Sequence, residues 1–164
     1  MEQTTQQPPA RQATEINLFG DDLPSLDRIK KLAQYVRSSE ANCLTFDAQV
    51  QENIAKTSPK SRLAVGIALY ILGRDREAVE KLEKAIDCKE KSIYLAFALR
   101  RMGKFNEAID NLQKIPHGTD TKSAALEKAA TYRRAGNFDA AAKELKSCAN
   151  FKNVSADYHY QLGR

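Results

Sequence analysis

The sequence predicts an all-α fold, an α-solenoid of stacked antiparallel helix pairs, from three observations. Apolar residues recur at helical spacing from Ser58 onward, and no alternating β-branched run survives beyond about four residues. A glycine is followed five residues later by an alanine at Gly73/Ala78, Gly103/Ala108 and Gly136/Ala141. Successive glycines of this set lie 30 and 33 residues apart. Because one helix pair cannot bury its apolar face alone, copies of such a pair are expected to stack.

The first part of the chain, residues 1–20, is predicted to be a disordered N-terminal tail. It is polar and rich in Gln, and it contains Pro8-Pro9. Ile16, Leu18 and Phe19 form its apolar element. This trio is either a short docking motif or the first segment to lie on the helices, and we favour docking within the chain.

Residues 21–57 are predicted to form a degenerate helix pair that caps the first repeat. The first helix is expected to open at Asp21-Asp22-Leu23-Pro24 and to run to about Arg37, with an apolar stripe on one face. The second is expected from about Glu40 to Lys56 with a less regular pattern. Terminal repeats are atypical because one of their faces must meet water.

Helices are then predicted at 59–72, 75–87, 90–102, 105–115, 121–135 and 138–148. Ser58-Pro59 has the composition of an N-cap followed by proline at the first helical position. Short polar side chains that could cap the second helix of each pair are Asp75, Asn106 and Asn137. Each glycine is expected to end the first helix of its pair in a left-handed conformation.

Residues 58–164 resemble tetratricopeptide repeats, a family whose units of about 34 residues each form two antiparallel helices. The resemblance rests on the turn glycines, on the early alanines of the second helices, and on the small residues Gly66, Ala96 and Ala129 in the middle of the first helices. Small residues allow two helix axes to approach closely. Tyr158, Leu162 and Gly163 fit the start of a fourth first helix, so the last repeat is expected to be incomplete and the chain a fragment of a longer solenoid.

The composition argues against a catalytic or metal-binding protein. The chain of 164 residues has a formal charge of +5, and residues from Pro59 onward carry a balance of +7. Cys43, Cys88 and Cys148 are dispersed and are read as small buried residues, and neither His117 nor His159 has a partner at ligand spacing. Phosphate loops and nucleophile elbows are absent from the sequence. We therefore expect no enzyme, no cofactor and no metal.

The family resemblance implies that the first helix of each unit lines a binding groove. The lining positions carried over from the family are apolar in the middle, at Leu63, Ile67, Ile93, Phe97, Leu126 and Ala130. Two arginine pairs precede the turn glycines of adjacent units, and stacking would align them as a basic stripe suited to bidentate contacts with carboxylates or phosphates. Cations are also favoured in the last turn of any helix, so the pairs have a structural explanation as well. The candidate partner-binding residues are Tyr70, Phe97, Arg100, Arg101, Arg133 and Arg134.

The sequence thus predicts a non-catalytic protein-interaction module that binds an extended or helical, acidic protein segment in the cytoplasm. It has no membrane span and no secretory signal. Residues 17–26 also resemble the segment before the repeats in certain bacterial tetratricopeptide proteins that carry a domain related to the RNA polymerase alpha C-terminal domain. The alternative is therefore a part of a larger bacterial transcription-associated protein or a nucleic-acid-associated adaptor. Direct nucleic-acid binding is disfavoured, because aromatic residues are not interleaved with the basic ones.

Overall fold

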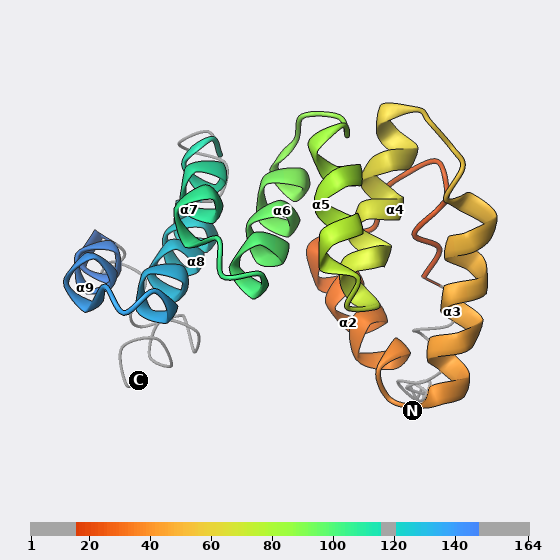
Figure 1. Ribbon diagram of the computed structural model, residues 1–164, viewed down its shortest axis with the longest axis horizontal. Coiled ribbons are helices and arrows are strands. Elements are labelled where there is room, and N and C mark those ends of the chain that lie inside the picture. Colours follow the sequence, from red (N-terminus) through yellow and green to blue (C-terminus); the bar gives the residue numbers. More distant parts are fainter. Residues whose placement is uncertain (1–15, 116–120, 148–164) are drawn as a thin grey trace, which may run out of the picture. The chain divides into compact units, whose positions relative to one another are not determined.

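The computed structural model describes residues 16–115 and 121–147, and all regular structure in these ranges is helical (Figure 1). The chain divides into two compact units, Met1–Ile86 and Asp87–Arg164. Unit 1 contains α2 (Leu26–Val36), α3 (Glu40–Asn53), α4 (Pro59–Ile71) and α5 (Asp75–Glu83). Unit 2 contains α6 (Lys89–Arg101), α7 (Phe105–Gln113), α8 (Thr121–Arg134) and α9 (Phe138–Ser147). The predicted all-α class is confirmed for the described residues.

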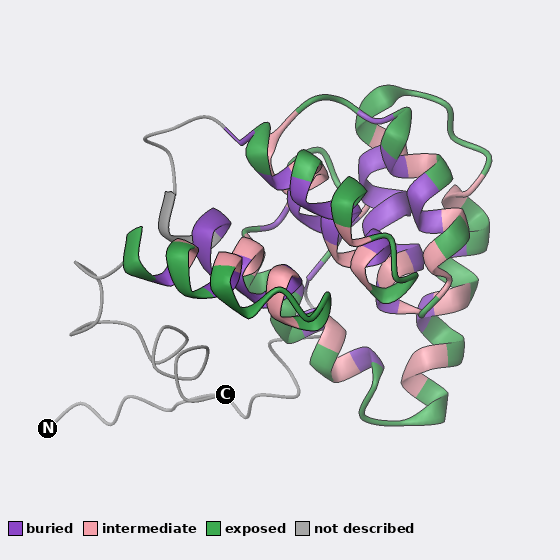
Figure 2. Ribbon diagram, turned by 60° about the vertical axis from the view of Figure 1, so that its left-hand side comes forward, coloured by how far each residue is buried: buried purple, intermediate pink, exposed green. Residues whose placement is uncertain are grey.

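Neighbouring helices pack as pairs, most extensively α4 with α5, α6 with α7, and α8 with α9. In unit 2, α7 also packs on α8, so that successive pairs share one core. Buried residues follow the facing sides of the paired helices, whereas the turns between them are exposed (Figure 2). The pairing that the glycine and alanine spacing predicts is therefore present in both units.

The three turn glycines end the first helix of each pair in the same way. Gly73, Gly103 and Gly136 have φ of 85°, 78° and 78°. After each glycine, the next residue's N–H donates back across the turn, as from Arg74 to the carbonyl of Leu69 at 2.9 Å. This is the Schellman arrangement, which needs a residue in the left-handed region and so favours glycine.

Small residues allow close helix contact within the pairs. Gly66 lies on α4 opposite Leu82 of α5, and a Cβ at Gly66 would lie 2.6 Å from the Leu82 Cγ. The equivalent Ala96 and Ala129 are 2% and 1% exposed. The early alanines of the second helices are also buried, at Ala78, Ala108 and Ala141.

The helix starts agree with the prediction in part. The Ser58 hydroxyl accepts from the N–H of Ser61 at 3.0 Å, and the Asn137 Oδ1 accepts from the N–H of Ala140 at 3.1 Å. Asn106 does not cap α7, because the helix already begins at Phe105 and Lys104 occupies the cap position. Asp75 is likewise inside the first turn of α5, after Arg74 at its cap position.

The second helices end earlier than their apolar pattern suggests. Helix α5 ends at Glu83 instead of residue 87, and α7 ends at Gln113 instead of residue 115. In unit 1 the N–H of Ile86 donates to the carbonyl of Pro59 at 3.1 Å, which ties the end of the pair to its beginning. Ala85 and Ile115 are buried although they lie outside the helices, and this burial explains why they extended the predicted pattern.

The N-terminal segment packs against the helices of unit 1. Ile16 and Leu18 are buried, and the ring of Phe19 lies 6.3 Å from that of Phe46 on α3. Docking of the apolar trio within the chain is therefore confirmed, and the packed part of unit 1 begins before residue 20. The Asn17 Oδ1 accepts from the N–H of Phe19 at 2.9 Å and closes a local turn.

The expected helix opening at Asp21 is wrong, because α2 begins only at Leu26. Pro24 lies before the helix and is buried, and a residue that precedes proline is disfavoured in the helical region. Residues 16–23, which we call the strap, are therefore non-helical.

Side-chain hydrogen bonds connect α2 and α3 to the first helix pair. The Arg37 guanidinium donates to the carbonyl of Ile71 at the end of α4, with Nε at 3.3 Å. The Lys81 ammonium of α5 donates to the carbonyl of Ile54 at 2.8 Å. Helices α2 and α3 contact each other less extensively than α4 and α5 do. Helix α3 also packs on α4, and the role of α2 and α3 as a cap stays a prediction.

Several apolar side chains and cysteines are not fully buried. Phe138 begins α9 and is 66% exposed, because it lies at the end of the stripe formed by Ala141 and Leu145. Phe105 is half-buried. Cys43 and Cys88 are also only half-buried, which corrects the prediction that the cysteines are core residues. Predictions for the tail before residue 16 and for the following residues lie outside the described ranges: His117, Cys148, Tyr158, His159, Leu162 and Gly163.

Candidate functional site

The two arginine pairs occupy equivalent positions at the ends of α6 and α8. Arg100 and Arg101 are in the last turn of α6, and Arg133 and Arg134 are in the last turn of α8. The N–H of each following glycine donates to the carbonyl of the first arginine, at 3.2 Å for Gly103 and 3.0 Å for Gly136. The two arginine pairs therefore occupy the same position in two helices of unit 2 that end in the same way.

Arg100 connects α6 directly to α8. Its Nη1 lies 2.9 Å from the Glu127 Oε2 and 3.3 Å from the Thr131 Oγ1. The side chains of Arg100 and Glu127 are 16% and 30% exposed. Because this ion pair is largely screened from water, it holds the two first helices of unit 2 side by side more effectively than a fully exposed pair would.

A pair of aromatic rings lies beside the Arg100 side chain. The guanidinium carbon of Arg100 lies 5.1 Å from the ring centroid of Phe97, within the range of cation–π contacts. The ring of Phe97 meets that of Tyr94 edge to face at 5.6 Å. Tyr94 is buried and Phe97 is half-buried, so part of the Phe97 ring remains accessible beside the arginine.

The other three arginines of the predicted stripe lie at the surface. Arg101 and Arg134 are exposed, and Arg133 is half-buried. The four arginines therefore differ in exposure, since Arg100 and Arg133 are half-buried whereas Arg101 and Arg134 are exposed. Their place in the last turn also favours them electrostatically, because the helix carbonyls concentrate negative potential there.

Tyr70 belongs to unit 1, where it is half-buried in the last turn of α4. Its repeat position is that of Arg100 and Arg133, three residues before the turn glycine. The structure groups the other five candidate residues in unit 2, so we consider Tyr70 apart from them.

The apolar middle of the expected groove is buried. Five of the six central lining positions are less than a tenth exposed: Leu63, Ile67, Ile93, Leu126 and Ala130. Phe97 is the exception, because it is half-buried. The expectation of an open apolar groove along these positions is therefore wrong, since the helices use these residues for their own core.

Glu127 and Thr131 were not singled out from the sequence. Thr131 is a fully buried polar residue, and its hydroxyl also donates to the carbonyl of Glu127 at 2.7 Å. Both residues stand on an alanine-rich helix, four positions apart on one face. Because Lys122, Ser123 and Lys128 are polar as well, the sequence of α8 does not set Glu127 and Thr131 apart, and no sequence signal identifies them as partners of Arg100.

The described residues hold no group of three or more His, Cys, Asp and Glu side chains that could bind a metal ion. Burial raises the pKa of the Cys88 thiol, although its Sγ accepts from the N–H of Lys91 at 3.5 Å. A thiol with a raised pKa is a poor nucleophile near neutral pH.

No model of a known protein family matches the chain, and comparison with curated proteins reveals no significant relative. Among the helices that the structure describes, none is long and apolar enough to cross a membrane. The assignment of a function therefore depends on the geometry of the site.

Proposed function

We propose that the chain is a non-catalytic protein-interaction module, an α-solenoid of the tetratricopeptide type that binds an acidic protein segment. The repeated Schellman turns and the small residues at the helix contacts support this repeat type. The binding surface that we propose consists of Arg101, Arg133 and Arg134 together with the accessible part of Phe97. It differs from the predicted stripe in that Arg100 organises the surface instead of contacting the partner.

The observation that carries the proposal is the bridge from Arg100 to Glu127 and Thr131. Because it ties α6 to α8, the two helices that end in arginine pairs are neighbours within unit 2. This supports a shared cationic surface that includes the exposed Arg101 and Arg134 and the half-buried Arg133. Guanidinium groups in such an arrangement suit bidentate contacts to carboxylates. An apolar partner side chain next to the acidic ones would pack on Phe97.

A fluorescein-labelled peptide that alternates glutamate and leucine tests this proposal by fluorescence anisotropy. We expect Arg101→Gln, Arg133→Gln and Arg134→Gln together to weaken binding by about 30-fold at low salt, since each exposed charge pair contributes roughly 0.5–1 kcal/mol. The matched control replaces Lys114, Lys143 and Lys146, which are exposed elsewhere in unit 2, with glutamine.

The control variant should bind the peptide almost as well as the wild type, and raised salt should weaken wild-type binding. Equal binding by the arginine variant and the wild type would contradict the proposed surface. Tighter binding of a DNA duplex than of the acidic peptide would instead favour a nucleic-acid partner and would also contradict the proposal.

A further inference from the structure

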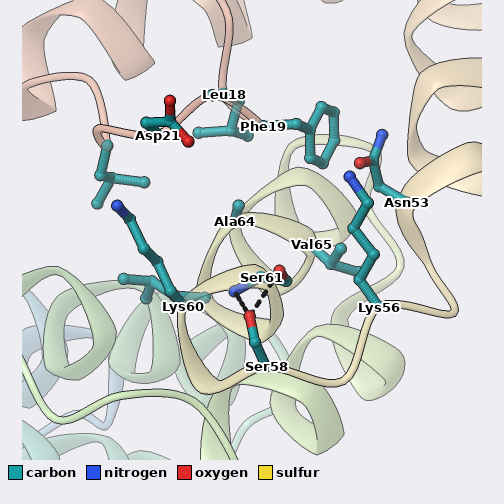
Figure 3. A pocket seen from close by; sticks show the side chains of 13 residues that line it. Leu18, Phe19, Asp21, Asn53, Lys56, Ser58, Lys60, Ser61, Ala64 and Val65 are labelled. Atoms are coloured by element: carbon teal, nitrogen blue, oxygen red, sulfur yellow. Dashed lines mark hydrogen bonds between the residues drawn. The ribbon is translucent and has the colours of Figure 1, made fainter.

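A cavity lies between the strap and the first turns of α4 in unit 1. It has a volume of about 310 Å³, near the lower end of the range for small-ligand pockets. The strap contributes Leu18, Phe19 and Asp21, and α4 contributes Leu63, Ala64 and Val65. Figure 3 shows the Ala64 side chain on α4 facing the strap, and this small side chain lines the cavity.

The apolar part of the cavity is well ordered by the packing around it. Leu18, Leu63 and Val65 are 2%, 4% and 1% exposed, so they belong to the core of unit 1 as well as to the cavity wall. The strap is held in place by the ring contact of Phe19 with Phe46. An apolar body that enters this cavity therefore meets a preformed surface, which lowers the entropic cost of binding.

Two lysines border the same cavity. Lys56 precedes α4 and Lys60 lies in its first turn, and both are exposed. Their side chains extend towards the strap from opposite sides of the first turn of α4 (Figure 3). Within residues 16–115 and 121–147, neither ammonium group forms an ion pair. Asp21 is the acidic residue among those that line the cavity, so the two cations outnumber the single carboxylate.

We propose that this cavity binds a small organic carboxylate with an apolar body. The apolar body would lie against Leu18, Ala64 and Val65, and the carboxylate would lie at the rim of the cavity within reach of the Lys56 or the Lys60 ammonium group. Charge-assisted hydrogen bonds from lysine to carboxylate are stronger than neutral ones, and the apolar walls exclude water from one side of them. This site lies in unit 1 and does not depend on the proposed peptide-binding surface of unit 2.

Titration of the ¹⁵N-labelled full chain with hexanoate tests the proposal by NMR. We expect saturable shifts confined to the amides of residues 18–23 and 56–65. Hexan-1-ol has the same apolar body without the charge and should bind about tenfold more weakly. Equal affinity for the alcohol and the acid, or shifts distributed over the whole chain, would overturn the proposal.

Variants that should weaken hexanoate binding, and one that should tighten it, make the test specific to the assigned residues. Lys56→Gln with Lys60→Gln should weaken hexanoate binding by about tenfold, and Asp21→Asn should tighten it by about twofold because it removes a repelling carboxylate. The matched control replaces Lys30 and Lys31, which are exposed on α2, with glutamine and should change little. An equal loss in the control, or weaker binding by Asp21→Asn, would contradict the assigned positions.

A carboxylate beside an apolar group also occurs at the end of a polypeptide, and N-acetyl-leucine represents that source. We expect hexanoate to bind more tightly, because the acetyl-leucine amide would lose water against Leu63, Ala64 and Val65 without gaining a partner there. Tighter binding of N-acetyl-leucine would overturn the assignment to a free organic acid. Binding of neither compound would overturn the site itself.

Discussion

The contact between Gly66 and Leu82 allows a sharp test of the helix packing in unit 1. In an ordinary helix interior, replacing glycine with alanine stabilises the protein by about 1 kcal/mol. At Gly66 the new Cβ would lie 2.6 Å from the Cγ and 2.8 Å from the Cδ2 of Leu82. Leu82 is fully buried, so it cannot move aside without disturbing the core.

Overpacking of this kind costs about 1–3 kcal/mol, and the severity of the contact places Gly66→Ala near the upper end. After subtraction of the gain in helix propensity, we expect Gly66→Ala to destabilise the protein by about 1–2 kcal/mol. Leu82→Ala alone should cost about 2–5 kcal/mol because it leaves a cavity. In the Leu82→Ala background both side-chain contacts are absent and the backbone nitrogen of residue 82, at 3.3 Å, stays close, so Gly66→Ala should then stabilise by less than about 1 kcal/mol.

The double-mutant cycle consists of the wild type, Gly66→Ala, Leu82→Ala and the double variant. Urea denaturation followed by circular dichroism measures the free energy of unfolding of each of them. The reversal of sign between the two backgrounds is the critical result. If Gly66→Ala stabilises the wild-type protein as it would in an isolated helix, α4 and α5 do not approach as closely as described. Ala96→Gly, at the equivalent position of α6, serves as the control and should destabilise in any background.

Three further predictions concern local features. Gly103→Ala should destabilise the protein by about 1–2 kcal/mol in urea denaturation. The positive φ is the sole cause, because an added Cβ would meet nothing within 4 Å. An unchanged midpoint of denaturation would contradict the left-handed turn. A double-mutant cycle between Arg100 and Glu127 should give a coupling of about 1 kcal/mol, and zero coupling would rule out the bridge as a stabilising contact. The Arg74 guanidinium lowers the pKa of Glu77, so this carboxylate stabilises the fold above its usual pKa of 4.5 and loses that contribution as the pH falls further. With Glu77→Gln, stability should therefore fall slightly less as the pH is lowered below the usual pKa of glutamate, and an unchanged pH profile would contradict the pairing.

The helix pairs could be predicted from the sequence because their determinants are local. A left-handed glycine, a serine N-cap and a small residue in mid-helix each leave a mark at a fixed position, as at Gly73, Ser58 and Gly66. The ends of the second helices could not be predicted as well. They depend on contacts between distant residues, such as the hydrogen bond from Ile86 to Pro59.

The places of the arginines at the helix ends could be predicted from the sequence, but their contacts could not. The positions of the arginines follow from the repeat, whereas the difference between Arg100 and Arg101 depends on what the neighbouring helix offers. Glu127 and Thr131 supply that partner, and no pattern within α6 reveals it. The burial of Ile93 and Leu126 likewise follows from packing between helices rather than from the repeat motif.

Methyl-edited nuclear Overhauser spectra test the central claim most directly, because that claim concerns which helices are in contact. We expect a cross-peak between the α-protons of Gly66 and the methyl groups of Leu82 in unit 1. In unit 2 we expect one between the methyl groups of Ala129 and Leu145, which belong to one buried cluster. Spectra that contain only contacts within single helices, with both of these cross-peaks absent, would contradict the paired architecture on which every proposal above depends.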